Sequence, residues 1–231
     1  MFLKELREAV LEANLELVRR GLVVFTFGNA SAFDRERQLA VIKPSGVPYE
    51  QLKSEDLVIT DSDGHIIEGN LRPSSDLPTH LALYRAWENV NGVVHTHSRY
   101  ATSWAQAHRE IPCLGTTHAD YFGGSVPVTR LMEPEEIQTE YELNTGHVII
   151  ERFAKLDPIA TPAVLVAGHA PFCWGRTVVD AAHTAAIVEE LAHMALLTLT
   201  INASAGPISS ALHLKHFSRK HGPDAYYGQV T

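Results

Sequence analysis

The segment Val93-Val94-His95-Thr96-His97 constrains the fold of this chain more than any other. Its valines favour a buried β-strand, and successive side chains of a strand point to opposite faces. Because His95 and His97 are two residues apart, both imidazoles are expected to point the same way. Two imidazoles on one face are two of the three protein ligands of a catalytic metal site. The segment predicts a strand that carries a candidate metal site; a partly exposed strand face without metal is the alternative.

Strand and helix patterns alternate along the rest of the chain. The turn sequence Asp61-Ser62-Asp63-Gly64 predicts a hairpin, which adds antiparallel pairing. The pattern therefore favours a single α/β domain over residues 1–231 with a mixed sheet between helices. Helices are predicted over residues 3–19, 77–87, 100–107, 134–143 (ended by Asn144-Thr145-Gly146) and 178–200, and strands over 22–27, 39–42, 57–60, 66–68, 92–96 and 163–167.

Composition narrows the functional class. A formal net charge of −8 over 231 residues argues against a nucleic-acid partner, although a local basic pocket can still hold a small anion. The two cysteines form no CxxC pair, so no disulfide framework is expected. The first ten residues, MFLKELREAV, carry charges where a signal peptide is apolar, and no apolar run approaches the roughly 18 residues of a membrane span. We expect a cytoplasmic protein without a membrane partner.

A third metal ligand is expected near the end of another strand. His169 lies in Gly168-His169-Ala170-Pro171, directly after the predicted strand 163–167. With His95 and His97 it would form a three-histidine site that leaves positions open for substrate. Cys173 is a further possible ligand, but a small core residue is the better interpretation. Asp76 precedes the histidine strand, and its spacing favours a helix N-cap.

Several polar segments are candidates for substrate contacts. Asp120 follows His118 in a predicted loop and is either an acid/base group or simply solvated. Gly28-Asn29, Lys43-Pro44-Ser45-Gly46 and Ser74-Ser75 offer amides, hydroxyls and an ammonium to an anion, although ordinary turns have the same composition. No phosphate-loop or dinucleotide-binding glycine pattern is present, so no nucleotide is implied. The basic stretch 213–221 is a solvated helix face, a lid over an anionic substrate, or a segment that reaches a neighbouring subunit.

Seven segments in order resemble one known family: GNAS at 28–31, KPSG at 43–46, PSSDLPTH at 73–80, HTHS at 95–98, GTTHADYF at 115–122, GHAPFCWG at 168–175 and RKHGPDAYYGQ at 219–229. Over nearly its whole length the chain resembles the L-ribulose-5-phosphate 4-epimerases of the class II aldolase/adducin superfamily. The resemblance implies a three-layer α/β/α fold with a mixed, largely antiparallel sheet, and a C4 homotetramer with active sites between subunits. It implies one divalent metal per subunit, zinc or else manganese or cobalt, on His95, His97 and His169, with Asp76 joining or flanking it.

The resemblance also implies roles for other side chains. Asp120 and Tyr227 match the acid/base pair, with Tyr227 contributed by the adjacent subunit. The implied reaction converts L-ribulose 5-phosphate to D-xylulose 5-phosphate through retro-aldol cleavage of C3–C4 and re-addition. Val166-Ala167 stands where the family often has an additional histidine, which leaves His169 alone in its turn. The positions that match substrate and phosphate contacts are Gly28, Asn29, Lys43, Ser45, Gly46, Ser74, Ser75, Thr116, Glu142, His216 and Arg219.

Two other functions stay open at this point. One is a sugar-phosphate aldolase of the fuculose-phosphate type, which would use the same metal site. In those aldolases a glutamate acts as the base in the region of Asp76, so the aspartate favours an epimerase. The other is a non-enzymatic interaction module of the adducin kind, which the intact metal ligands disfavour.

Overall fold

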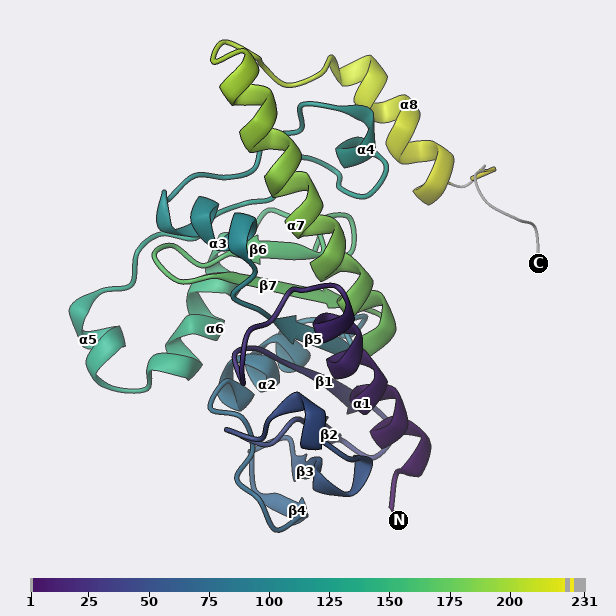
Figure 1. Cartoon of the computed structure of the whole chain (residues 1–231), viewed down its shortest axis with the longest axis vertical. Helices are drawn as coiled ribbons and strands as arrows, with labels where there is room; N and C mark the ends of the chain where they lie inside the picture. Colours follow the sequence, from purple (N-terminus) through teal and green to yellow (C-terminus); the bar gives the residue numbers. More distant parts are fainter. Residues whose placement is uncertain (1, 223–224, 227–231) are drawn as a thin grey trace.

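A seven-stranded sheet in the order β4-β3-β2-β1-β5-β7-β6 forms the centre of the molecule (Figure 1). The computed structural model describes residues 2–222 and 225–226, so Tyr227 lies outside the described residues. The strands are β1 (Asn29–Asp34), β2 (Leu39–Ile42), β3 (Val58–Asp61), β4 (Ile66–Glu68), β5 (Gly92–His95), β6 (Ala163–Leu165) and β7 (Pro171–Gly175). The α-helices are α1 (Lys4–Arg19), α2 (Leu77–Ala86), α3 (Arg99–Gln106), α4 (Thr116–Ala119), α5 (Pro134–Gln138), α6 (Tyr141–Arg152), α7 (Val178–Ile201) and α8 (Ser210–His221), with short 3-10 helices at Tyr49–Gln51 and Ser54–Asp56.

Pairing within the sheet is antiparallel between all neighbouring strands that the structure describes. The one parallel contact in this part of the chain is an isolated bridge between Val128 and Leu165 at the β6 edge. The expectation of a largely antiparallel sheet is confirmed, whereas a mixed sheet of regular strands is not found. In three of the strand pairs, β1–β2, β3–β4 and β6–β7, the second strand follows the first with no other element between them. Such short connections allow only antiparallel pairing.

Helices cover both faces of the sheet, as the predicted three-layer architecture requires. Side chains of α1, α3 and α7 share one apolar cluster with Val94 of β5. Side chains of α2 and α6 share the second cluster with Val93, the preceding residue. Adjacent valines of one strand thus fill opposite cores, which is the period-two alternation expected of a central strand. These two cores hold β5 rigidly in the middle of the sheet.

Helix α7 is the one helix in the described chain that is long and apolar enough to cross a membrane. It packs against β5, β7, α1 and α3, and it carries the charged residues Asp180, Glu189 and Glu190. Its last turns expose Leu196, Leu197 and Ile201. These contacts identify α7 as a core helix with a free apolar end.

The predicted strand over 22–27 is wrong. These residues are irregular with a turn at Phe25 and Thr26, Phe25 has a left-handed φ of 55° and is 81% exposed, and β1 begins only at Asn29. Gly28 explains the shift: its φ is 81°, and a Cβ there would lie 2.7 Å from the carbonyl oxygen of His95. Glycine therefore lets the chain turn closely against β5 before the strand starts.

The predicted helix over 134–143 with its stop at 144–146 is also wrong. Two helices are present, and α6 continues through that proposed stop. Gly146 lies inside α6, and a Cβ there would lie 2.7 Å from the Cβ of Ala82 on α2. It permits close packing of α6 on α2. Strand β7 was not predicted, and residues 116–119 form a short helix instead of the expected loop.

The buried His118 predicts an acid-sensitive fold. Its Nε2 donates to the carbonyl of Gly124 at 2.9 Å, and burial lowers its pKa from 6.5 to about 4. The unfolded chain binds this proton below pH 6.5 while the folded chain does not, so this contribution to stability is lost as the pH falls from 6.5 towards 4. His118 alone should lower the free energy of unfolding by about 1.4 kcal/mol per pH unit in this window. Urea denaturation of wild type and His118→Gln should show the shallower slope in the variant; equal slopes would contradict the assignment.

Candidate metal and substrate site

Three histidines from two separate segments of the chain meet at the end of β5. His95 ends β5, His97 follows it, and His169 lies in the tight turn between β6 and β7. One ring nitrogen from each lies within 4.8 Å of the others. Because β7 pairs directly with β5, the β6–β7 turn necessarily lies next to the end of β5. The structure therefore brings the three histidines together, as their sequence positions predicted.

The ring of His95 is fixed in one orientation. Its Nδ1 lies 3.0 Å from the carbonyl oxygen of Pro171, which can only accept a hydrogen bond. Nδ1 is therefore the protonated nitrogen, and the lone pair of the neutral ring is on Nε2. Phe172 stacks on the ring with centroids 4.2 Å apart. Nε2 of His95 lies 3.1 Å from Nε2 of His97, so the lone pair of His95 faces the ring of His97.

The donor set fits a divalent metal such as zinc. Two nitrogens bound to one tetrahedral zinc at about 2.0–2.1 Å lie roughly 3.3 Å apart, close to the separation of the His95 and His97 Nε2 atoms. Burial lowers the pKa of His169 to about 4, and His95 and His97 act in the same direction. Burial, followed by the neighbouring His95, also lowers the pKa of His97. Neutral imidazoles, the form that ligates metals, are thus present at neutral pH.

Tyr141 on α6 is a neighbour of this centre that the sequence did not predict. Its hydroxyl lies 3.3 Å from Nδ1 of His169. Metal-binding histidines commonly use their second nitrogen for such a contact, which orients the ring. Its position next to Glu142, a predicted site residue, is the only sequence signal that pointed to it.

Asp76 lies at the N-cap position of α2, but its side chain makes no capping hydrogen bond. Its Oδ2 instead accepts a hydrogen bond from Asn29 Nδ2 at 2.6 Å, and the same amide contacts Ser74 Oγ at 3.0 Å. Burial raises the pKa of Asp76, but the nearby His95 and His80 and the Asn29 amide outweigh it, so its pKa is below the usual value. Asp76 is thus an ionised group that interacts electrostatically with His95 and His169, and the cluster of three ring nitrogens does not include it.

The predicted anion-binding segments lie together. The backbone of Ser45 donates to Arg72, and that of Ser74 donates to Lys43, so residues 43–46 run alongside 72–75. Lys43 is only 1% exposed; its Nζ lies 4.7 Å from the centre of the Tyr49 ring. The Tyr49 hydroxyl donates to the carbonyls of Phe27 and Gly28, which ties the loop before β1 to the same region. Ser45, Gly46 and Ser75 are exposed beside the buried ammonium.

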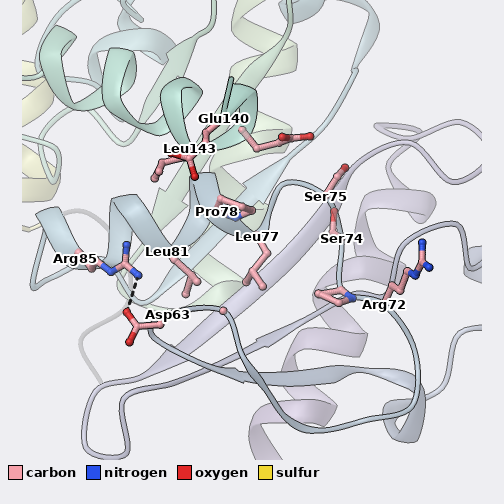
Figure 2. Close-up of a pocket in the computed structure, with 13 residues that line it drawn as sticks. Asp63, Arg72, Ser74, Ser75, Leu77, Pro78, Leu81, Arg85, Glu140 and Leu143 are labelled. Atoms are coloured by element: carbon pink, nitrogen blue, oxygen red, sulfur yellow. Dashed lines mark hydrogen bonds and ion pairs between the residues drawn. The ribbon is translucent and has the colours of Figure 1, made fainter. Parts of the chain in front are cut away.

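A cavity of about 640 Å³ opens next to Ser74 and Ser75. Figure 2 shows the two serines near one end and the Arg85–Asp63 ion pair at the other, with Leu77, Pro78 and Leu81 of α2 between them. Glu142, a predicted site residue, also lines it. Among the described residues that line this cavity there is no histidine, so it does not contain the three-histidine cluster. Its lining residue Ser74 is bonded to Asn29, the partner of Asp76.

Asp120 lies in a second cluster, between α4 and α8. Its carboxylate accepts hydrogen bonds from Arg219 at 2.9 and 2.5 Å and from His216 at 3.0 Å. Although burial acts in the opposite direction, Arg219 and His216 hold the pKa of Asp120 below its usual value. Thr116 accepts the backbone hydrogen bond of Asp120 and belongs to the same cluster. Figure 1 shows α4 and α8 near the C-terminal end of α7, apart from β5.

The predicted site residues therefore fall into two groups within one chain. Gly28, Asn29, Lys43, Ser45, Gly46, Ser74, Ser75, Asp76, His95, His97, Glu142 and His169 lie around the end of β5 and the adjoining cavity. Thr116, Asp120, His216 and Arg219 form the second group.

A three-histidine cluster at the end of an interior strand of an α/β/α sandwich is the kind of centre that can hold a catalytic metal ion. The chain belongs to the class II aldolase and adducin family, whose N-terminal domain profile matches residues 8–196. An L-ribulose-5-phosphate 4-epimerase UlaF from Salmonella paratyphi B is 56% identical to it, over 98% of this chain and 100% of that relative. The same protein from Salmonella typhi is equally similar.

Solved structures of the family share the fold. An L-fuculose 1-phosphate aldolase superimposes with a TM-score of 0.79 at 25% identity, covering 94% of this chain and 96% of that chain. An L-fuculose-1-phosphate aldolase from Thermus thermophilus superimposes with a TM-score of 0.68 at 23% identity, covering 87% and 98%. The second likeness concerns the fold alone.

Proposed function

We propose that this chain is an L-ribulose-5-phosphate 4-epimerase that inverts C4 to give D-xylulose 5-phosphate. The observation that carries the proposal is the three-histidine centre beside a serine-lined cavity, in a chain 56% identical to epimerases of that name. The hydrogen on C4 is not acidic, because C4 is not adjacent to the C2 carbonyl. Inversion therefore proceeds by cleavage and re-formation of the C3–C4 bond.

His95, His97 and His169 would hold a divalent metal, zinc in the first instance and manganese or cobalt otherwise, with Asp76 as a fourth ligand or an adjacent anion. When bound, such an ion supplies Lewis-acid stabilisation of negative charge on oxygen. The contact of His95 with Pro171 and that of His169 with Tyr141 keep these rings in place before the metal arrives. The ionised Asp76 adds negative charge that favours a cation.

The substrate phosphate binds between residues 43–46 and 72–75. Ser45, Ser74 and Ser75 supply hydroxyls, Gly46 permits close approach of the backbone, and Lys43 supplies a positive charge. Gly28 holds its loop against β5 beside this region. Asn29, held by Ser74 and Asp76, links the phosphate region to the metal centre. An anchored phosphate keeps the two-carbon aldehyde fragment in the site while it rotates.

Asp120 and Tyr227 carry the protons. Loss of the C4 hydroxyl proton lets the electrons of the C3–C4 bond move to C3, which gives the enediolate of dihydroxyacetone and glycolaldehyde phosphate. Rotation exposes the other face of the aldehyde, and re-addition followed by proton return gives the inverted C4. Asp120, ionised at neutral pH, is in the proton-accepting form, and Arg219 and His216 orient it. Thr116 and Glu142 line the reaction space.

The two groups of site residues support a homotetramer with active sites between subunits. Asp120 ends α4 and His95 ends β5, and these two elements lie apart within one chain, so we infer that a neighbour supplies the Asp120 that meets each metal centre. Tyr227, beyond α8, would come from the same neighbour. We further propose that residues 1–231 act as one cytoplasmic domain without a nucleic-acid or membrane partner.

An aldolase is the second candidate, because the L-fuculose 1-phosphate aldolase structure shares the fold at 25% identity. A direct comparison separates the two. The metal-loaded protein is offered L-ribulose 5-phosphate and L-fuculose 1-phosphate in parallel, while free aldehyde is trapped enzymatically. An epimerase inverts the first substrate and releases little aldehyde; rapid cleavage of the second with release of its aldehyde would establish the aldolase.

The buried Lys43 predicts that substrate binding weakens at alkaline pH. Burial lowers the pKa of Lys43 to about 8, so its ammonium is charged below this pH and neutral above it. The KM for L-ribulose 5-phosphate should rise about tenfold between pH 7 and pH 9, while the phosphate stays a dianion. Lys43→Met, similar in length but uncharged, should have a high KM at pH 7 and a flat profile. The same alkaline rise in the variant would assign it to another group.

A further inference from the structure

The turn that carries His97 leads directly into α3, whose first residues need hydrogen-bond acceptors. The N–H groups at the start of a helix have no partner within it. Ser98 occupies the N-cap position, and serine commonly accepts one of these bonds there. In this structure it makes no capping bond, and its buried hydroxyl has no partner among the described residues.

Glu189 on α7 takes the place of that cap. Its two carboxylate oxygens accept the backbone N–H groups of Tyr100 and Ala101, each at 2.9 Å. A carboxylate at this position also interacts favourably with the positive end of the helix dipole. Each bond joins residues 88 or 89 positions apart in the sequence. They therefore hold the start of α3 to α7, whereas a serine cap would bond only within the same turn.

Two further contacts hold the same junction. The ring of His193, one turn after Glu189, stacks on Tyr100 with centroids 3.9 Å apart and planes 8° apart. The indole nitrogen of Trp104 donates to the carbonyl of Ala192 at 3.0 Å. His97, Glu189 and His193 line one cavity of about 430 Å³. Helix α7 thus fixes the direction in which the chain leaves His97.

The position of His97 depends on the anchored start of α3 more than the positions of His95 and His169 do. His95 is held through Pro171, and His169 contacts Tyr141. Within residues 2–222, the hydrogen bond found for the His97 ring is to His95 Nε2, the nitrogen that would itself face the metal. His97 is also the exposed member of the three. No hydrogen bond from outside the metal centre orients its ring in the described chain, so its place is set by residues 96–98.

We propose that Glu189 is a positioning residue of the metal centre, which holds His97 through the N-terminus of α3 without touching metal or substrate. This inference rests on the proposed metal site at the three histidines. It assigns a role in metal affinity to a carboxylate that is not a ligand. The two-oxygen contact predicts a graded response, because glutamine keeps one acceptor oxygen and alanine keeps none.

The test compares Glu189→Ala and Glu189→Gln with two controls on the same helix. Glu190→Ala removes the adjacent exposed carboxylate, and Leu191→Ala destabilises the core without touching α3 amides. The readouts are the zinc dissociation constant from competition with a chromogenic chelator, the visible spectrum of the cobalt-loaded protein, and amide exchange of Tyr100 and Ala101 in metal-free protein. Glu189→Ala should weaken zinc binding about 10- to 100-fold, shift the cobalt bands and speed exchange. Glu189→Gln should lie between it and wild type, and Glu190→Ala should match wild type.

Wild-type zinc affinity and an unchanged cobalt spectrum in Glu189→Ala would overturn the inference. Equal weakening by Leu191→Ala would also overturn it, because general destabilisation would then explain the loss. If Glu189→Ala does not fold, Glu189→Gln decides by the same readouts. A wild-type protein that binds no zinc or cobalt would overturn the proposed metal site itself, an outcome distinct from a variant that binds as well as wild type.

Discussion

Replacing His97 with asparagine is expected to abolish metal binding and turnover together. The variant removes one of three nitrogens that lie within 4.8 Å of one another. If the metal supplies about 4 kcal/mol or more of transition-state stabilisation, its loss lowers kcat/KM at least about a thousandfold. Metal content of the purified protein, measured by mass spectrometry after dialysis, and epimerase activity should fall in parallel.

The matched control for this substitution is His183→Asn on α7, an exposed histidine away from the centre. It should retain full metal content and activity. A His97→Asn protein that keeps one metal per chain would show that His97 is not a ligand. Retained metal with lost activity would assign His97 to substrate contact instead.

Replacing Asp120 with asparagine should lower kcat about 100- to 10,000-fold while the metal stays bound. Asparagine keeps the size of the side chain and one oxygen that can accept from Arg219 or His216. It removes the negative charge and the capacity to take a proton. The expected signature is therefore a loss in kcat with little change in metal content or thermal stability.

Asp34→Asn is the control for Asp120→Asn, because Asp34 also pairs with an arginine, Arg37, but on the surface. It should leave kcat unchanged. A kcat within twofold of wild type in Asp120→Asn would remove Asp120 from proton transfer and reduce it to an anchor for α8.

Mixing the two inactive variants tests the inter-subunit arrangement. His97→Asn retains Asp120, and Asp120→Asn retains the metal centre. In a ring that reassociates at random, half of the chains keep the metal centre and half of their neighbours supply Asp120, so about a quarter of the activity should return. No recovery after exchange of subunits would contradict sites shared between chains.

The sheet was predictable where burial sets a strict period. The alternation in β5 and the hairpin around Asp63-Gly64 are local signals, and both elements lie where they were expected. The errors at 22–27 and 144–146 share one cause. Gly28 is required because its loop packs closely on β5, and Gly146 is required because α6 packs closely on α2. From the sequence alone, such a glycine cannot be told from one that ends a helix or strand.

The three-histidine cluster was more predictable than the side chains that surround and orient it. Spacing alone paired His95 with His97, and the position of His169 after a strand supplied the third histidine of the cluster. Asp76 illustrates the limit: its sequence position is that of a helix cap, whereas its carboxylate is bonded to Asn29, 47 residues away. Tyr141 and Glu189 could not be predicted, because each acts through a contact between segments distant in the sequence.

The central claim is tested most directly by following D-xylulose 5-phosphate formation from L-ribulose 5-phosphate in a coupled assay. The metal-loaded protein is measured before chelation, after chelation and after zinc is restored. The account predicts product that disappears with the chelator and returns with zinc. Absence of product from fully loaded protein, or product formation that the chelator does not affect, would contradict a metal-dependent epimerase.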